Sequence, residues 1–215
     1  MKKIFCLFSI FILTGCFVQG YWEIEDLPYT GPYLESHYFD IEDLEIDGLG
    51  TGKAFEVTLN YVTDGDTARF HTPYDSIYTS SFRFFNIDTK EATTTKEEWG
   101  FPGTEYTKKM LENAYSIVLQ TDNNDAVTDN YNRGLVWVWI QDNENSNYEL
   151  LNYKLLQQGL ATVRYTYGAG EDMYYNDISY LDYLYEAEDY GVKNNLGMYS
   201  NLLDPYWDYE NNTVL

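Results

Sequence analysis

Cysteine is scarce in this sequence: Cys6 and Cys16 are the only two among 215 residues, and both lie near the first residue. The rest of the chain therefore has no pair for an intramolecular disulfide, and its stability has to come from core packing. Apolar runs are also scarce, since the stretch 4–13 is followed by none that approaches the roughly 20 residues needed to cross a bilayer. We expect nothing beyond this first stretch to hold the protein to a membrane.

Basic residues are few as well. Lysine and arginine number 13 against 35 aspartates and glutamates, which gives a formal net charge of −22. A protein of this charge is repelled by polyanions at long range. However, 8 of the basic residues lie between 53 and 133 beside 13 acidic ones, so this region is the least acidic part of the chain. This distribution weakens the objection that the net charge raises against binding of a polyanion.

The first residues have the composition of an export signal. Two lysines precede the apolar stretch 4–13, and Leu13-Thr14-Gly15-Cys16 follows. The pattern is similar to a bacterial lipoprotein box, which implies that residues 1–15 are removed and that Cys16 carries a thioether-linked lipid. The protein would then be anchored to the outer face of the cell membrane. The alternatives are an ordinary signal peptide, with secretion, or an uncleaved anchor with a chance cysteine.

The remaining chain divides into three parts by composition. Residues 16–52 contain glycine, proline and a run of acids without a sustained period, which predicts an acidic tether, although its tyrosines and Trp22 could instead pack on the domain. Residues 53–200 form the predicted domain, which is of ordinary size for a single core. Residues 201–215 are a C-terminal tail.

Hydrophobic periodicity predicts an α+β domain. Alternating or continuous apolar residues indicate strands at 54–61, 67–72, 81–87, 116–121, 135–140 and 160–165. Helical spacing indicates helices from Thr104 to about 114, from 147 or 148 to 158, and from about 178 to 193. The run at 135–140 is nearly all apolar, so this strand is expected to be buried on both faces.

Charged residues stand at the ends of these strands. Asp66 lies in the turn Asp64-Gly65-Asp66-Thr67, where the alternating run at 54–61 stops, and Asp88 and Glu91 follow the run at 81–87, which contains Arg83. A third segment, Asp129-Asn130-Tyr131-Asn132-Arg133-Gly134, precedes the apolar strand. Carboxylates and arginines placed in this way suit a hydrolytic metal site that acts on a phosphate.

Together the three segments resemble the thermonuclease family, the staphylococcal-nuclease-like domains. The signature of that family is D-G-D-T, then F-R-x-x-x-x-D-T-P-E, then D-x-Y-G-R, and the resemblance covers about 54–200. It implies a five-stranded β-barrel of the oligonucleotide-binding kind packed with three α-helices. Two positions depart from the pattern: Lys90 stands where the family has proline, and Asn132 replaces a glycine.

The resemblance also implies roles for the polar residues. Asp66, Asp88 and the backbone carbonyl of Thr89 would ligate Ca²⁺, and Glu91 would act as the general base or orient the attacking water. Arg83 and Arg133 would bind the scissile phosphate, because the planar guanidinium offers two parallel hydrogen bonds and stays charged. Contacts with the nucleotide would come from Tyr131, Tyr165 and Tyr167.

The function that follows is a calcium-dependent, sugar-nonspecific nuclease, expected to be a monomer, that hydrolyses DNA and RNA at the cell surface so that the 5′-oxygen leaves. One alternative is a catalytically silent barrel that binds nucleic acid or acts as an adhesin. Another is a calcium-binding surface protein without hydrolysis, which would leave Arg83 and Arg133 without a role. The presence of both arginines together with Glu91 and the two aspartates favours the nuclease.

The lipid prediction is tested by Cys16→Ser. This variant is expected to leave the membrane fraction and to appear in the soluble fraction, because no other segment is predicted to anchor the protein. Fractionation with and without detergent measures the change. Continued partitioning of the variant into detergent would indicate an uncleaved leader instead.

Overall fold

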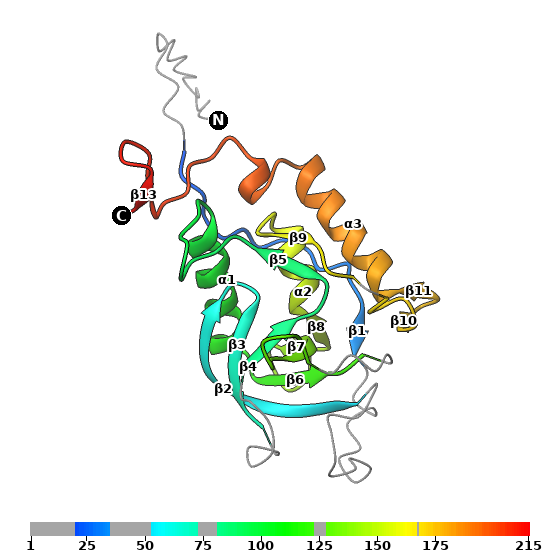
Figure 1. Ribbon diagram of the computed structural model, residues 1–215. Helices are drawn as coiled ribbons and strands as arrows, with labels where there is room; N and C mark the ends of the chain where they lie inside the picture. Colours follow the sequence, from blue (N-terminus) through cyan, green and yellow to red (C-terminus); the bar gives the residue numbers. More distant parts are fainter. Residues whose placement is uncertain (1–19, 35–52, 73–80, 123–127, 167) are drawn as a thin grey trace, which may run out of the picture.

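The computed structural model describes residues 20–34, 53–72, 81–122, 128–166 and 168–215 (Figure 1). Its centre is a closed barrel in which the strands neighbour one another in the order β7-β4-β3-β2-β6, with β6 pairing back to β7. The barrel strands are β2 (Ala54–Asp64), β3 (Thr67–His71), β4 (Ser81–Phe84), β6 (Ser116–Gln120) and β7 (Gly134–Gln141). Only the β4–β7 pair among them is parallel. The predicted five-stranded barrel is confirmed.

The barrel interior is apolar because of the residue pattern of its strands. In β2 the alternation places Phe55 and Val57 inside. Strand β7 is buried along nearly its whole length, as its unbroken apolar run predicts. Its two tryptophans still need partners for their ring N–H groups. Trp137 Nε1 donates to Asp122 Oδ2 at 3.1 Å, and Trp139 Nε1 donates to Gln120 Oε1 at 2.9 Å. Buried polar atoms of this kind are costly unless they are paired.

The strand predicted at 81–87 is in fact two strands. Strand β4 ends at Phe84, the chain turns at Asn86, and β5 (Ile87–Thr89) leaves the barrel to pair with β9 (Ala161–Val163). Asn86 has a φ of 58°, a left-handed conformation that asparagine tolerates better than most residues. The amide of Asn152 donates to the carbonyl of Phe85 at 2.8 Å and holds the turn. Because of this break, β5 runs away from the barrel.

Three α-helices among the described residues pack around the barrel, as predicted. They are α1 (Gly100–Asn113), α2 (Leu151–Gln157) and α3 (Tyr180–Lys193). Helix α3 begins after Ser179, whose hydroxyl accepts from the Asp182 amide at 3.0 Å. Helix α2 is shorter than expected, because 148–150 forms β8 (Tyr148–Leu150) against β7. No helix of the described segments is long and apolar enough to cross a membrane.

Helix α1 starts four residues before the predicted Thr104. The residue before it, Trp99, has a φ of 74°, and its amide donates to the carboxylate of Asp204 at 2.7 Å. The hydroxyl of Thr104 instead donates to the carbonyl of Gly100 at 3.0 Å, inside the first turn. The start of the helix is thus set by a residue 105 positions away in the chain, which no local pattern contains.

Residues 20–34 and the C-terminal residues lie together on the domain. Trp22 is 6% exposed and packs edge-on against Trp99 at 6.2 Å between ring centroids, and its amide donates to the carbonyl of Leu203 at 2.8 Å. Strand β1 (Tyr33–Leu34) extends the sheet by pairing with β8. Figure 1 shows this segment in blue beside the red C-terminal residues. The alternative in which Trp22 packs on the domain is the one observed.

The remaining short elements complete the described chain. They are β10 (Tyr174–Tyr175), β11 (Ile178–Ser179), the 3-10 helix η3 (Gly197–Tyr199), β12 (Trp207–Asp208) and β13 (Thr213–Val214). Strands β12 and β13 pair as a hairpin, so the predicted tail contains ordered structure. The leader with Cys16 and residues 35–52 lie outside the described residues, and the predicted boundaries at 15, 52 and 200 stay predictions.

The packing of Trp22 predicts a stability effect. Trp22→Ala should lower the free energy of unfolding by about 3 kcal/mol, the usual cost of truncating a buried aromatic side chain to alanine. Urea denaturation followed by circular dichroism measures it. Tyr21 is adjacent but 60% exposed, so Tyr21→Ala is the matched control and should change the free energy by about 0.5 kcal/mol or less. Equal effects of the two variants would contradict the packing.

Candidate functional site

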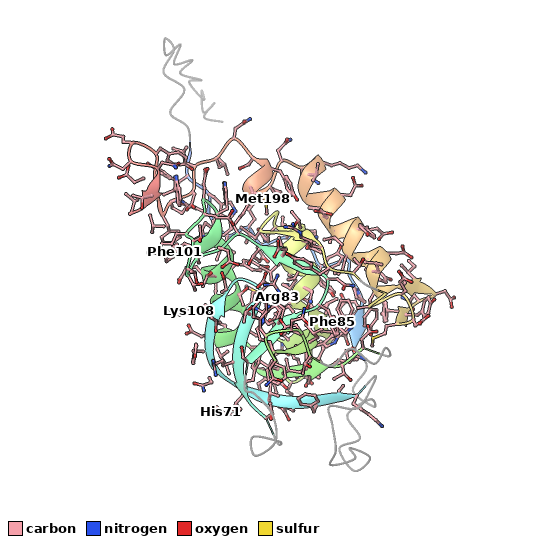
Figure 2. The ribbon with its side chains drawn as sticks, viewed as in Figure 1. His71, Arg83, Phe85, Phe101, Lys108 and Met198 are labelled. Atoms are coloured by element: carbon pink, nitrogen blue, oxygen red, sulfur yellow. The ribbon has the colours of Figure 1, made fainter. Side chains whose placement is uncertain are left out.

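A cleft of about 1070 Å³ opens where β4 ends and β5 leaves the barrel. Six of the predicted site residues line it: Arg83, Asp88, Glu91, Tyr131, Arg133 and Tyr165. In Figure 2 Arg83 lies in the middle of the molecule, whereas Lys108 of α1 and His71 at the end of β3 lie at its edge. These six residues are up to 82 positions apart in the sequence, from Arg83 to Tyr165.

The guanidinium of Arg83 joins the two aspartates that are predicted to ligate the metal. Its Nη1 lies 2.7 Å from Asp66 Oδ1, and its Nη2 lies 2.8 Å from Asp88 Oδ1. The same Nη2 donates to the carbonyl of Ile87 at 3.1 Å. Strand pairing sets this geometry, since Thr67 faces Arg83 in the β3–β4 register and β5 follows β4 directly.

Asp66 is almost completely buried at 1% exposure. Its Oδ2 accepts from the Thr89 amide at 2.9 Å, and its Oδ1 accepts from the Thr67 hydroxyl at 3.0 Å. Burial raises the pKa of the carboxyl, and the charge of Arg83 and the two hydrogen bonds only partly oppose this rise. Gly65 lets β5 approach this closely, because a Cβ there would lie 2.8 Å from Thr89 Oγ1.

The donor atoms offered by Asp66, Asp88 and Thr89 are all oxygens, which suits a hard divalent cation. Beside them Thr89 Oγ1 is buried and has no hydrogen-bond partner among the described residues. Within the described ranges no three acidic, histidine or cysteine side chains form a metal cluster, so this donor set supplies two carboxylates rather than three. The residues fit a weakly held calcium ion with water completing its shell.

Glu91 lies in the loop after β5 and is held by its neighbours. Its amide donates to Glu97 Oε2 at 3.0 Å, and the Glu97 amide donates back to the Glu91 carbonyl at 2.8 Å. Burial raises the pKa of Asp64 to about 7, and the charges of Asp66 and Glu91 and a hydrogen bond to Glu91 add to the rise. The carboxyl groups of Asp64 and Glu91 are therefore neighbours, and Asp64 Oδ1 also accepts from the Gly65 amide at 2.9 Å. Lys90 pairs with Glu97 at 3.7 Å and does not line the cleft.

Arg133 is positioned by Asp129, a residue that was not among the predicted site residues. Its Nε and Nη2 lie 2.7 and 2.6 Å from Asp129 Oδ2, and its Nη1 donates to the Thr67 hydroxyl at 3.4 Å. Burial alone would raise the pKa of Asp129, but the amide and guanidinium of Arg133 outweigh it, so that pKa is lowered. Asn132 has a φ of 60°, which explains how asparagine replaces the glycine of the family pattern.

Two tyrosines of the cleft, Tyr131 and Tyr165, lie against arginine side chains. Tyr131 is 82% exposed and lies over Arg133 at 5.5 Å. Tyr165 lies 6.0 Å from the guanidinium of Arg83 and 5.1 Å from that of Arg164. Tyr167 lies outside the described residues, and its predicted contact with the nucleotide stays a prediction.

Arg164 was missed by the sequence analysis. Its Nη1 lies 2.9 Å from Asp88 Oδ2, so Asp88 contacts two arginines. Arg164 directly follows β9, the partner strand of β5. The only signal in the sequence is its place immediately before Tyr165, since a basic residue after a short strand is common on protein surfaces.

This fold and site define an α+β protein with a closed barrel of the oligonucleotide-binding kind and an arginine–carboxylate cluster at one end. The family model described as staphylococcal nuclease homologue matches residues 81–200. Because the match covers more than half of the 215 residues, the chain belongs to this family, which is a family of nucleases. Asp64 and Asp66 precede the matched range, and the structure brings them to the cluster.

The pairing of Arg83 predicts an effect on stability. In the presence of a chelator, Arg83→Ala should lower the free energy of unfolding by about 3 kcal/mol at pH 7, because it leaves two carboxylates without their common partner. The loss should shrink toward pH 4, since burial raises the pKa of Asp66 and its protonation removes the unpaired buried charge. Urea denaturation at both pH values measures it, with Arg69→Ala on β3 as the control. A loss below about 1 kcal/mol at pH 7 would contradict the assigned role of Arg83.

Proposed function

We propose that this protein is a calcium-dependent nuclease that hydrolyses phosphodiester bonds of both DNA and RNA at the surface of a bacterial cell. The observation that carries the proposal is the arginine of β4, Arg83, held between Asp66 and Asp88 at the edge of a cleft that Glu91 and Arg133 also line. Membership of the nuclease family supports the reaction class. The cation, the substrates and the location are the proposed parts.

Asp66, Asp88 and the carbonyl of Thr89 are the residues that would hold calcium. A bound calcium ion supplies positive charge to the phosphoryl oxygens and a site for the attacking water. Two carboxylates give a weak site, which is adequate outside a cell, where calcium is abundant. The deep burial of Asp66 fixes one ligand, whereas Asp88 is partly exposed at the rim of the cleft.

The remaining polar residues handle the phosphate and the proton. Arg133 has its guanidinium oriented by Asp129, and Arg83 by two carboxylates, so both are arranged before the substrate arrives. They bind the phosphoryl oxygens and stabilise the charge that develops there, and the 5′-oxygen leaves. Glu91 accepts the proton of the attacking water, and its backbone is held at the cleft by two hydrogen bonds with Glu97.

Tyr131 and Tyr165 give the cleft a means of binding bases of any sequence. Both are well exposed, at 82% and 50%, and both already lie over arginine side chains. Base stacking on aromatic rings tolerates every sequence, because each base has a π-face. This supports the absence of a sequence requirement and the use of both DNA and RNA.

The attachment to the cell surface rests on Cys16, and the protein is proposed to act there as a monomer. The rival function, a silent barrel that only binds nucleic acid or acts as an adhesin, leaves the geometry of Glu91 unexplained. Glu91 lines the cleft, and both its amide and its carbonyl are bonded to Glu97. A binding module gains nothing from a positioned base, whereas a hydrolase requires one.

The proposal is tested with purified protein, plasmid DNA and single-stranded RNA. Hydrolysis is expected with calcium and should be lost with excess chelator. Glu91→Gln and Arg133→Ala should each lower turnover by about two to four orders of magnitude with the fold intact, the scale of a positioned base or a partner of the developing charge. Gel assays of single turnovers measure the rates.

The matched control is Glu112→Gln, which removes the charge of an exposed glutamate on α1 away from the cleft. It should leave turnover within about twofold of the parent, since surface substitutions have small effects. Full activity in chelator would overturn the calcium dependence. Losses below tenfold for both Glu91→Gln and Arg133→Ala would mean that other residues carry the reaction.

A further inference from the structure

Asp88 is contacted by guanidinium groups on both of its carboxylate oxygens. Arg83 Nη2 lies 2.8 Å from Oδ1, and Arg164 Nη1 lies 2.9 Å from Oδ2. Arg164 is held at this position by its backbone, because its amide donates to the carbonyl of Asn86 at 2.9 Å, directly beyond the β5–β9 pair. The contact is therefore built into the strand pairing that places Asp88 at the cleft.

The two arginines differ in how firmly they are held. The Arg83 side chain is 13% exposed and binds two carboxylates, whereas that of Arg164 is 60% exposed at its contact with Asp88. Water screens an exposed ion pair, so the Arg164 contact is much the weaker of the two. Its guanidinium also lies 5.1 Å from the ring centroid of Tyr165, a residue that lines the cleft. The Arg164 side chain can therefore keep its contact with this ring while its guanidinium moves from Asp88 toward the cleft.

The distribution of arginine adds a second argument. The sequence has four arginines in a chain of net charge −22. Arg83 and Arg133 line the cleft, and Arg164 contacts Asp88 and Tyr165, two residues of its lining. The fourth, Arg69, lies over Tyr61 at 5.6 Å on the barrel. Arg83 and Arg133 are each held by buried or bidentate contacts, so Arg164 is the one able to reach a phosphate beyond the scissile one.

We propose that Arg164 is a further substrate-binding residue: it neutralises Asp88 when no cation is bound, and it binds the neighbouring phosphate of the nucleic acid once a cation occupies Asp88. This inference rests on the proposed function. Two cations beside one carboxylate repel each other, so occupation of Asp88 by calcium weakens the hold on Arg164. Removal of Arg164 should therefore strengthen calcium binding and weaken binding of the substrate. If Arg164 had only a structural role, its removal would not strengthen calcium binding while weakening substrate binding.

The first measurement is calcium binding by calorimetry to the parent, Arg164→Ala and Arg164→Gln. The two variants should bind calcium about two to five times more tightly than the parent, the range expected for removing one exposed competing ion pair. Arg69→Ala is the matched control, because it removes another arginine stacked on a tyrosine, and it should bind calcium like the parent. Unchanged or weaker binding in both Arg164 variants would overturn the proposal.

The second measurement is binding of a short single-stranded oligonucleotide to Glu91→Gln, with and without Arg164→Ala, at saturating calcium. The slope of log affinity against log salt should become shallower by about 0.7, the loss of one phosphate contact on a single strand. Affinity at low salt should fall by roughly tenfold, because a charge-assisted hydrogen bond is lost. Adding Arg69→Ala to the same background should leave the slope unchanged.

The outcomes separate this inference from the proposed function. A parent that binds no calcium would overturn the proposed function, and the role of Arg164 with it. If the parent binds calcium and Glu91→Gln binds the oligonucleotide, a calcium affinity or an oligonucleotide salt slope that Arg164→Ala leaves unchanged would overturn the role of Arg164 alone. The exposure of the Arg164 side chain means that neither variant should disturb folding, which thermal unfolding checks.

Discussion

The site depends on one guanidinium placed between two carboxylates. Arg83 ties the turn after β2, strand β4 and strand β5 to one another through Asp66, Asp88 and the carbonyl of Ile87. The cluster extends outward on both sides: Arg164 contacts the far oxygen of Asp88, and Thr67 links Asp66 to Arg133. Positive and negative groups thus alternate across the end of the barrel. A very acidic protein in this way keeps positive charge where an anionic substrate would bind.

Much of the fold could be predicted from local pattern. The alternation in β2 and the unbroken apolar run of β7 specify barrel strands, and Ser179 marks the start of α3. What could not be predicted depends on distant contacts. The break at Asn86 needs the amide of Asn152, and the start of α1 needs the carboxylate of Asp204, and neither lies near the residue that it positions.

The candidate site was predictable where residue type, order and strand context agreed. Asp66, Arg83, Asp88, Glu91 and Arg133 were predicted from three short segments, and the structure brings them to one end of the barrel. Their roles stay predictions. Asp129 was inside one of these segments but acts on Arg133, a relation that spacing alone did not indicate. Arg164 lies in no motif, because only the β5–β9 pairing makes it a neighbour of Asp88.

Trp99 is contacted by the ring of Trp22 and donates its amide to Asp204, and these two contacts bear on the limits of the domain. The family match begins at 81 and ends at 200, yet the barrel strands β2 and β3 precede it. Asp204, which accepts from the Trp99 amide just before α1, follows it. Glu91 is joined to that same region, since its carbonyl and amide both bond to Glu97, two residues before Trp99. The unit that folds is therefore larger than the range that the family model matches. Asp204, beyond the matched range, therefore helps to hold residues 97–99, to which the loop that carries the proposed base is bonded.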